Sequence, residues 1–152
     1  MIFLMRHSQA VSADYKTRDD SRWLTEAGRK LALEAGRALA KQETIDCIVS
    51  SPCCRAVQTA ELVAQVLGYQ GEIAILESLR SEASPQMAVE ELRQLPFAVV
   101  LATSHEPIVS NMSLLLSQQS STAGNSRVRT AGFRTAEIRC HSEGTQRWHW
   151  RG

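Results

Sequence analysis

Short apolar segments separated by amphipathic stretches make up the first two thirds of the chain. The apolar segments predict buried strands, because a strand covered on both faces has a nearly continuous hydrophobic sequence. The amphipathic stretches predict helices, since their apolar residues recur at helical spacing. We expect strands at 2–5, 47–50, 73–76 and 97–102, and helices at 25–41, 51–68, 85–95 and 107–117.

Capping residues define the expected helix boundaries. Thr25 has the side chain of an N-cap, so the first helix is expected to follow it and to run to about Lys41. The second helix is expected to have Ser51 as its cap and Pro52 in its first position, and to end at Gly68.

The pattern changes to a period of two near the C-terminus. GFRTAEIRCH and QRWHW predict an antiparallel hairpin, with Trp148 and Trp150 on one buried face and His149 pointing the other way. Residues 117–127 predict a flexible polar loop, and residues 11–22 a surface loop that is either simply solvated or borders a pocket. Alternating strands and helices predict one α/β domain over residues 1–152, with a mixed, mostly parallel sheet and helices on both faces.

Composition and charge narrow the range of functions. Hydrophobic residues make up 43% and charged residues 22% of the 152 residues, as in soluble globular proteins. The formal net charge of +1 gives no electrostatic reason to bind nucleic acid or a membrane surface. No apolar run approaches the ~20 residues that span a bilayer, and residues 1–5 lack the basic flank of a signal peptide. We therefore expect a cytoplasmic protein.

Cationic and imidazole side chains follow three of the predicted strands. Arg6 and His7 come directly after the first, Arg55 lies near the start of the helix after the second, and His105 follows the fourth. Because ligands of open α/β sheets bind beyond the carboxyl ends of the strands, these side chains are expected to form one pocket. A helix N-terminus favours anions, and Arg55 beside it makes sense if an anion binds there. The pattern predicts a pocket for a tetrahedral dianion, in which an imidazole can act as a nucleophile.

Two other chemistries fit the sequence less well. The four cysteines are Cys47, Cys53, Cys54 and Cys140. None has an arginine six residues later, as a C-x5-R phosphate loop requires, and free thiols are expected. The four histidines are His7, His105, His141 and His149. No pair of them has i,i+4 spacing, and the two arginines would repel a dication, so neither a metal nor another cofactor is expected.

Four segments carry a resemblance to a known family: LMRHSQA, LTEAGRKLA, VSSPCCRAVQTAELV and ATSHEPIVS. They are similar to the motifs of the histidine phosphatase superfamily, which includes the cofactor-dependent phosphoglycerate mutases. The first resembles its Arg-His-Gly motif, the third its S-S-P-x-x-R-A-x-Q-T-A motif, and the fourth its second-histidine motif, in matching order and spacing. The short chain and its W-x-W ending resemble the small bacterial SixA-type branch.

The resemblance implies an α/β/α sandwich like that of the phosphoglycerate mutases, with His7 as a nucleophile that becomes phosphorylated. Arg6, Arg55 and His105 would bind the phosphoryl group and neutralise its charge, with Ser8 as a further phosphate-binding residue.

Two features depart from the family pattern. Ser8 and Ser104 stand where the motifs have glycine. If glycine at position 8 serves a positive φ or a close backbone approach, Ser8 must adopt that conformation at some cost. Larger members use a glutamate as general acid, for which Glu82 is the candidate here and Glu77 the alternative.

The SixA-type resemblance implies hydrolysis of a phosphohistidine on a signalling protein. An imidazole, with a conjugate-acid pKa of ~6.5, leaves more easily than an alkoxide, so a weak general-acid signal favours phosphoramidate substrates. Two alternatives stay open: a phosphatase for small phosphate esters, and a phosphate-binding module whose turnover Ser8 has weakened. A mutase is disfavoured, because little sequence is left to build a lid over a small metabolite.

Overall fold

The computed structural model describes residues 1–14, 18–118, 134–142 and 145–152. Within them the chain forms a six-stranded sheet in the order β3-β2-β4-β1-β5-β6. The strands are β1 (Ile2–Arg6), β2 (Cys47–Ser50), β3 (Ala74–Ile75), β4 (Val100–Ser104), β5 (Ile138–Ser142) and β6 (Thr145–Trp150). The first four are parallel, whereas β5 pairs antiparallel with β1 and β6. The predicted mixed, mostly parallel sheet is confirmed.

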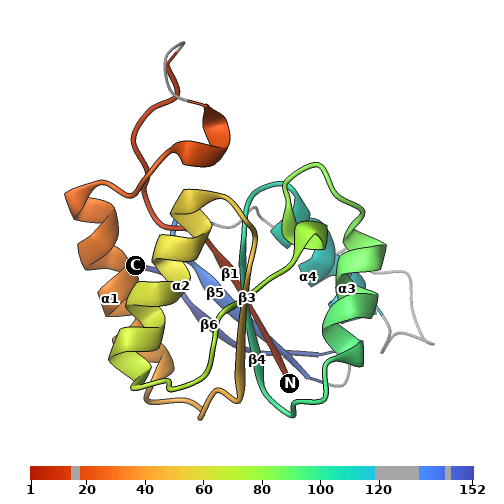
Figure 1. The fold of residues 1–152 in the computed structure, drawn as a ribbon. Helices are drawn as coiled ribbons and strands as arrows, with labels where there is room; N and C mark the ends of the chain where they lie inside the picture. Colours follow the sequence, from red (N-terminus) through yellow and green to blue (C-terminus); the bar gives the residue numbers. More distant parts are fainter. Residues whose placement is uncertain (15–17, 119–133, 143–144) are drawn as a thin grey trace.

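Helices cover both faces of the sheet (Figure 1). They are α1 (Glu26–Leu39), α2 (Cys54–Leu67), α3 (Pro85–Gln94) and α4 (Ile108–Gln118), with short 3-10 turns η1 (Asp19–Ser21) and η2 (Glu77–Leu79). The pair α1–α2 packs on one face and the pair α3–α4 on the other, which is the expected α/β/α sandwich. In the described part of the chain, no helix has both the length and the apolar composition to span a membrane.

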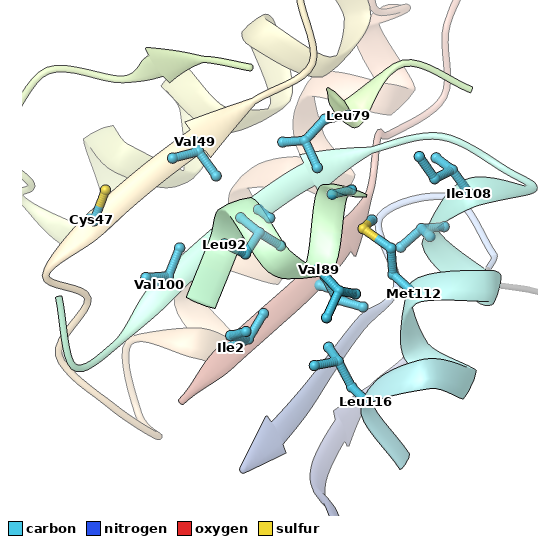
Figure 2. Packing of buried hydrophobic residues seen from close by; sticks show 14 residues of the cluster. Ile2, Cys47, Val49, Leu79, Val89, Leu92, Val100, Ile108, Met112 and Leu116 are labelled. Atoms are coloured by element: carbon cyan, nitrogen blue, oxygen red, sulfur yellow. The ribbon is translucent and has the colours of Figure 1, made fainter. Parts of the chain in front are cut away.

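Alternate residues of the central strands supply two cores. Leu4 of β1 packs in the core beneath α3 and α4, and its neighbour Met5 packs in the core beneath α1 and α2. Both are fully buried, which is why the strand sequence is apolar from Ile2 to Met5. Figure 2 shows the first core, where the sheet meets Leu92 of α3 and Met112 of α4.

The helix ends confirm two predicted caps and correct a third. Thr25 caps α1, with its Oγ1 accepting a hydrogen bond from the Gly28 N–H at 3.0 Å, and Gly68 ends α2 with a left-handed φ of 63°. The start of α2 was predicted wrongly: the helix begins at Cys54, with Cys53 in the N-cap position. Ser51 does not cap it, because the Ser51 hydroxyl is hydrogen-bonded to His105.

Other boundaries move by a few residues. β4 runs to Ser104, beyond the predicted 97–102, because Ser104 pairs with Arg6 at the end of β1; Phe97 is exposed ahead of the strand. β3 is only two residues long and exposed at the sheet edge. The polar loop predicted at 117–127 begins within α4, and from residue 119 onward it lies outside the described residues.

The predicted C-terminal hairpin is confirmed. Trp148 and Trp150 of β6 pack half-buried against the core beneath α1 and α2, with the Trp148 ring edge-on to Phe3 at a centroid distance of 6.1 Å. His149 is exposed, and its Nε2 lies 2.9 Å from Oε1 of Glu137. The two tryptophans of the WHW ending therefore face the core and His149 faces away from it, as predicted.

Candidate active site

The carboxyl ends of β1, β2 and β4 lie side by side at one edge of the sheet. Arg6 pairs with Ser104, and Ser50 pairs with Thr103, so the three strands end at the same level. Beyond them the His7 N–H donates to the Ser104 carbonyl at 2.8 Å, which continues the ladder past the strands. The residues that follow the strands are thereby brought together, as the sequence pattern predicts.

His7 is held as a neutral imidazole with a defined tautomer. Its Nδ1 lies 2.7 Å from the Ser8 carbonyl, which can only accept, so Nδ1 carries the proton and Nε2 carries the lone pair. Burial lowers the pKa of His7 to about 4, with further lowering by the charges of Arg55 and Arg6. At neutral pH His7 therefore presents an unprotonated nitrogen, which is the form required of a nucleophile.

His105 lies beside His7 at the pocket. The two rings are 5.0 Å apart between centroids and inclined at 56°, and Nε2 of His105 is 2.8 Å from the Ser51 hydroxyl. Burial, followed by the proximity of His7 and of Arg55, lowers the pKa of His105 to about 3. Its buried Nδ1 has no hydrogen-bond partner among the described residues, as is also true of Nδ1 of His141 outside the pocket.

Arg55 connects His7 to the loop between β1 and α1. It lies in the first turn of α2, its side chain is nearly buried, and its Nε donates to Nε2 of His7 at 3.3 Å. Its other nitrogens donate to Asp19 of η1, Nη1 to the backbone oxygen at 2.6 Å and Nη2 to Oδ2 at 2.8 Å. Residues 18–22 therefore border the pocket. Sequence reasoning missed Asp19, because its charge is one of several opposite charges in that loop.

Arg6 completes the cationic side of the pocket. It ends β1, its backbone N–H donates to the Glu137 carbonyl at 3.1 Å, and its charge is among those that lower the pKa of His7. Glu137 itself has a fully buried carboxylate bonded to Arg139, His149 and Arg151. Burial opposes its ionisation, but hydrogen bonds from the Arg134 N–H and from Arg151 and Arg139 outweigh it and lower the pKa. This buried ion cluster holds the start of β5 beside Arg6.

Ser8 and Ser104 occupy the motif glycine positions without backbone strain. Among the described non-glycine residues only Ala136 has a positive φ, so neither serine needs a conformation that favours glycine. The Ser8 hydroxyl donates to the Gly28 carbonyl at 2.7 Å, and the Ser104 hydroxyl donates to the Leu79 carbonyl at 2.6 Å. Both hydroxyls thus have backbone acceptors and tie the strand ends to neighbouring segments.

A close approach between two backbone segments does occur next to Ser8, but it involves Gly28 and the Gln9 carbonyl. A Cβ at position 28 would overlap the carbonyl oxygen of Gln9, which also accepts the Thr25 N–H at 3.0 Å. The first turn of α1 therefore lies directly on the backbone that follows His7 and Ser8.

Neither candidate general acid is bonded to a histidine in the described residues. The Glu82 side chain is exposed and accepts a hydrogen bond from Ser81 at 2.7 Å, which lowers its pKa. Glu77 forms an ion pair with Arg80 at 2.6 Å. In the described residues neither carboxylate has a hydrogen bond or ion pair to His7 or His105.

The other two histidines do not join the pocket. His141 lies at the opposite end of the sheet, paired in register with Ile2 and bonded through Nε2 to Ser113, and His149 contacts Glu137. No group of three potential metal-ligating side chains occurs among the residues described.

The buried neutral histidines predict a strong pH dependence of stability. His7, His105 and His141 have pKa values lowered to about 4, 3 and 4, whereas an unfolded histidine titrates near its ordinary value of 6.5. Only the unfolded chain takes up these protons between pH 6.5 and 4, so stability is full above 6.5 and falls as the pH is lowered, by about 1.4 kcal/mol per pH unit for each histidine. Urea unfolding at pH 7.5 and 5.5 measures this loss. Equal free energies of unfolding at the two pH values would contradict it.

Comparison with known proteins agrees with this geometry. A family model of the histidine phosphatase superfamily (branch 1) matches residues 2–84, just over half of the chain. A comparison with curated proteins found no match. Among solved structures, the protein histidine phosphatase SixA complexed with tungstate is 25% identical, with a TM-score of 0.76 over 97% of this chain and 94% of that one.

Two further structures share the fold at lower identity. A candidate phosphohistidine phosphatase SixA from Nakamurella multipartitia is 20% identical, with a TM-score of 0.80 over 99% of this chain and 94% of that one. A mycobacterial glucosyl-3-phosphoglycerate phosphatase is 15% identical, with a TM-score of 0.65 over 91% of this chain and 87% of that one. The chain belongs to the histidine phosphatase superfamily, branch 1, and has the fold of its SixA-type members.

Proposed function

We propose that this phosphatase hydrolyses a phosphohistidine on a signalling protein, with His7 as its nucleophile. The observation that carries the proposal is the state of His7, a buried neutral imidazole whose Nε2 lone pair lies beside the Arg55 guanidinium. Phosphoryl transfer depends mainly on positioning and charge stabilisation, which a fixed imidazole between fixed cations supplies.

The reaction has two displacement steps at phosphorus. In the first, Nε2 of His7 attacks phosphorus, and the bond from phosphorus to the substrate nitrogen breaks with its electron pair going to that nitrogen. The substrate ring, protonated on its other nitrogen, leaves as a neutral imidazole. Arg6, Arg55 and His105 stabilise the charge on the phosphoryl oxygens. In the second, water attacks the phosphorus on His7, and the phosphorus–nitrogen bond breaks with its electron pair returning to Nε2. Inorganic phosphate leaves with both protons of the water, and His7 is restored.

The positions of the carboxylates favour a nitrogen leaving group. An alkoxide is a strong base that needs a proton as it leaves, whereas an imidazole leaves without such help. Glu82 is exposed and has a lowered pKa, so in the free protein it holds no proton to donate. Its role as a proton donor stays a prediction for ester substrates. The similarity to SixA, a protein histidine phosphatase, supports the same substrate class.

A phosphatase for small phosphate esters is the second candidate. The fold shared with glucosyl-3-phosphoglycerate phosphatase favours it, because that protein acts on a phosphate ester.

Leaving-group dependence separates the two candidates. The purified protein should hydrolyse a phosphohistidine-containing protein at least about a hundredfold faster, in kcat/KM, than an alkyl phosphate. Phosphate release with both substrates measures this ratio. Equal rates would overturn the phosphohistidine assignment and favour the ester phosphatase.

Glu82→Gln tests the general acid within the same assay. Because an imidazole leaving group needs no strong acid, we expect phosphohistidine hydrolysis to stay within about twofold of wild type. Any loss should appear with the alkyl phosphate alone. Glu77→Gln, which removes the alternative candidate carboxylate, is assayed beside it. A large loss of phosphohistidine hydrolysis in Glu82→Gln alone would contradict this account of the leaving group.

A further inference from the structure

The loop between β1 and α1 carries an acidic side chain to the anion-binding arginine. The turn η1 lies at the end of the sheet where α2 begins (Figure 1), and it contacts α2. From η1, Asp19 accepts two hydrogen bonds from Arg55, one through its backbone oxygen and one through Oδ2. A carboxylate thus already lies on the guanidinium that the proposed reaction requires.

The two hydrogen bonds that Asp19 accepts involve different sides of the Arg55 guanidinium. Nε and Nη2 form one side, on which Nε faces Nε2 of His7 at 3.3 Å and Nη2 holds Oδ2 of Asp19 at 2.8 Å. A phosphoryl group bonded to Nε2 of His7 would lie against this same side, and its oxygens would accept from both nitrogens. Oδ2 of Asp19 therefore stands where a phosphoryl oxygen would bind. Nη1 donates to the Asp19 backbone oxygen, and this second contact does not conflict with the phosphoryl group.

The displaced carboxylate has another cation to hold it. Its second oxygen, Oδ1, accepts from Nη1 of Arg22 at 2.7 Å, and Nε of Arg22 is fixed by the Val11 carbonyl at 2.8 Å. The hydrogen bond from Arg22, together with that from Arg55, holds the pKa of Asp19 below its ordinary value, so the side chain is an anion at neutral pH. More than half of the Asp19 side chain is exposed, which leaves it room to turn towards Arg22.

We propose that Asp19 is an internal competitor for the phosphoryl site. In the resting protein its carboxylate neutralises Arg55; when substrate binds, Nη2 passes from Asp19 to the phosphoryl group while Arg22 keeps the carboxylate. The competition excludes singly charged anions, because their charge is no greater than that of the Asp19 carboxylate they would have to displace from Arg55. A phosphoryl dianion carries more charge and binds Arg55 more strongly. This inference rests on the proposed function only in taking phosphoryl groups as the ligands of the pocket.

Anion binding tests the inference without any need for turnover. The affinity for inorganic phosphate is measured by titration calorimetry at pH 7.5 for the wild type, Asp19→Asn and Asp20→Asn. Asp19→Asn removes the competing charge but keeps the backbone contact to Arg55, so phosphate should bind at least about fivefold more tightly. Asp20→Asn makes the same charge change in the same turn. Asp20 contacts Arg80 and Cys53 but not Arg55, so this variant should stay within about twofold of wild type.

Three outcomes would overturn the inference. Equal or weaker phosphate binding by Asp19→Asn would mean that Asp19 supports Arg55 and does not compete with the ligand. Equal gains in phosphate affinity in both variants would show that the effect comes from the change in net charge and not from the contact of Asp19 with Arg55. If neither the wild type nor Asp19→Asn binds phosphate, both the inference and the anion pocket fail. Tighter phosphate binding by Asp19→Asn, together with no phosphohistidine turnover by the wild type, would leave the inference standing and overturn the proposed function alone.

Discussion

His7→Ala should abolish phosphohistidine hydrolysis, with kcat falling by at least about a thousandfold. The substitution removes the nitrogen that attacks phosphorus, and no neighbouring side chain replaces it: Nε2 of His105, the nearest imidazole, is hydrogen-bonded to Ser51. Single-turnover assays with a phosphohistidine-containing protein measure the loss. The variant should still bind inorganic phosphate, because Arg6, Arg55 and His105 remain.

The control is His141→Ala, which removes another buried neutral histidine at the opposite end of the sheet. It is expected to lose stability but to retain turnover. If His7→Ala kept more than a tenth of the wild-type rate, another nucleophile would have to be sought. Phosphate binding without turnover in the wild type itself would support the phosphate-binding module.

Arg55→Lys should lower kcat by about a hundredfold or more, although it preserves the charge. Lysine cannot present two parallel N–H groups to phosphoryl oxygens, and its ammonium cannot take the place of Nε beside His7. Because the contact matters most when charge spreads over the oxygens in the transition state, kcat should fall more than KM rises.

Arg80→Lys is the matched control for Arg55→Lys. Arg80 also binds an aspartate of η1, Asp20, but it has no contact with His7, so the substitution should leave kcat within about twofold. If Arg55→Lys were equally harmless, Arg55 would serve only to hold the loop, and its assigned part in phosphoryl transfer would be wrong.

The features that the sequence predicts well are those with local causes. β1 is recognisable from Ile2 to Met5 because both of its faces are buried, so no polar residue interrupts it. The meeting of His7, Arg55 and His105 follows from the parallel order of β1, β2 and β4, which alternating strands and helices already suggest.

The features that the sequence does not predict depend on distant partners. Ser51 has the composition and position of a cap, but its hydroxyl is bonded to His105, 54 residues away, so the helix starts later. Asp19 and Asp20 look alike in a loop of mixed charge, yet only Asp19 reaches Arg55. Ser8 replaces a motif glycine without needing a positive φ, and its hydroxyl has an acceptor in Gly28 of the next helix.

The central claim is that His7 carries the phosphoryl group during turnover. The most direct measurement is rapid quenching of the wild-type reaction in alkali, followed by mass spectrometric mapping of phosphate on the chain. We expect a transient, acid-labile phosphate on Nε2 of His7 that forms and decays at rates consistent with turnover. Turnover with the phosphate on another residue, or with no phosphorylated protein at any time point, would contradict it.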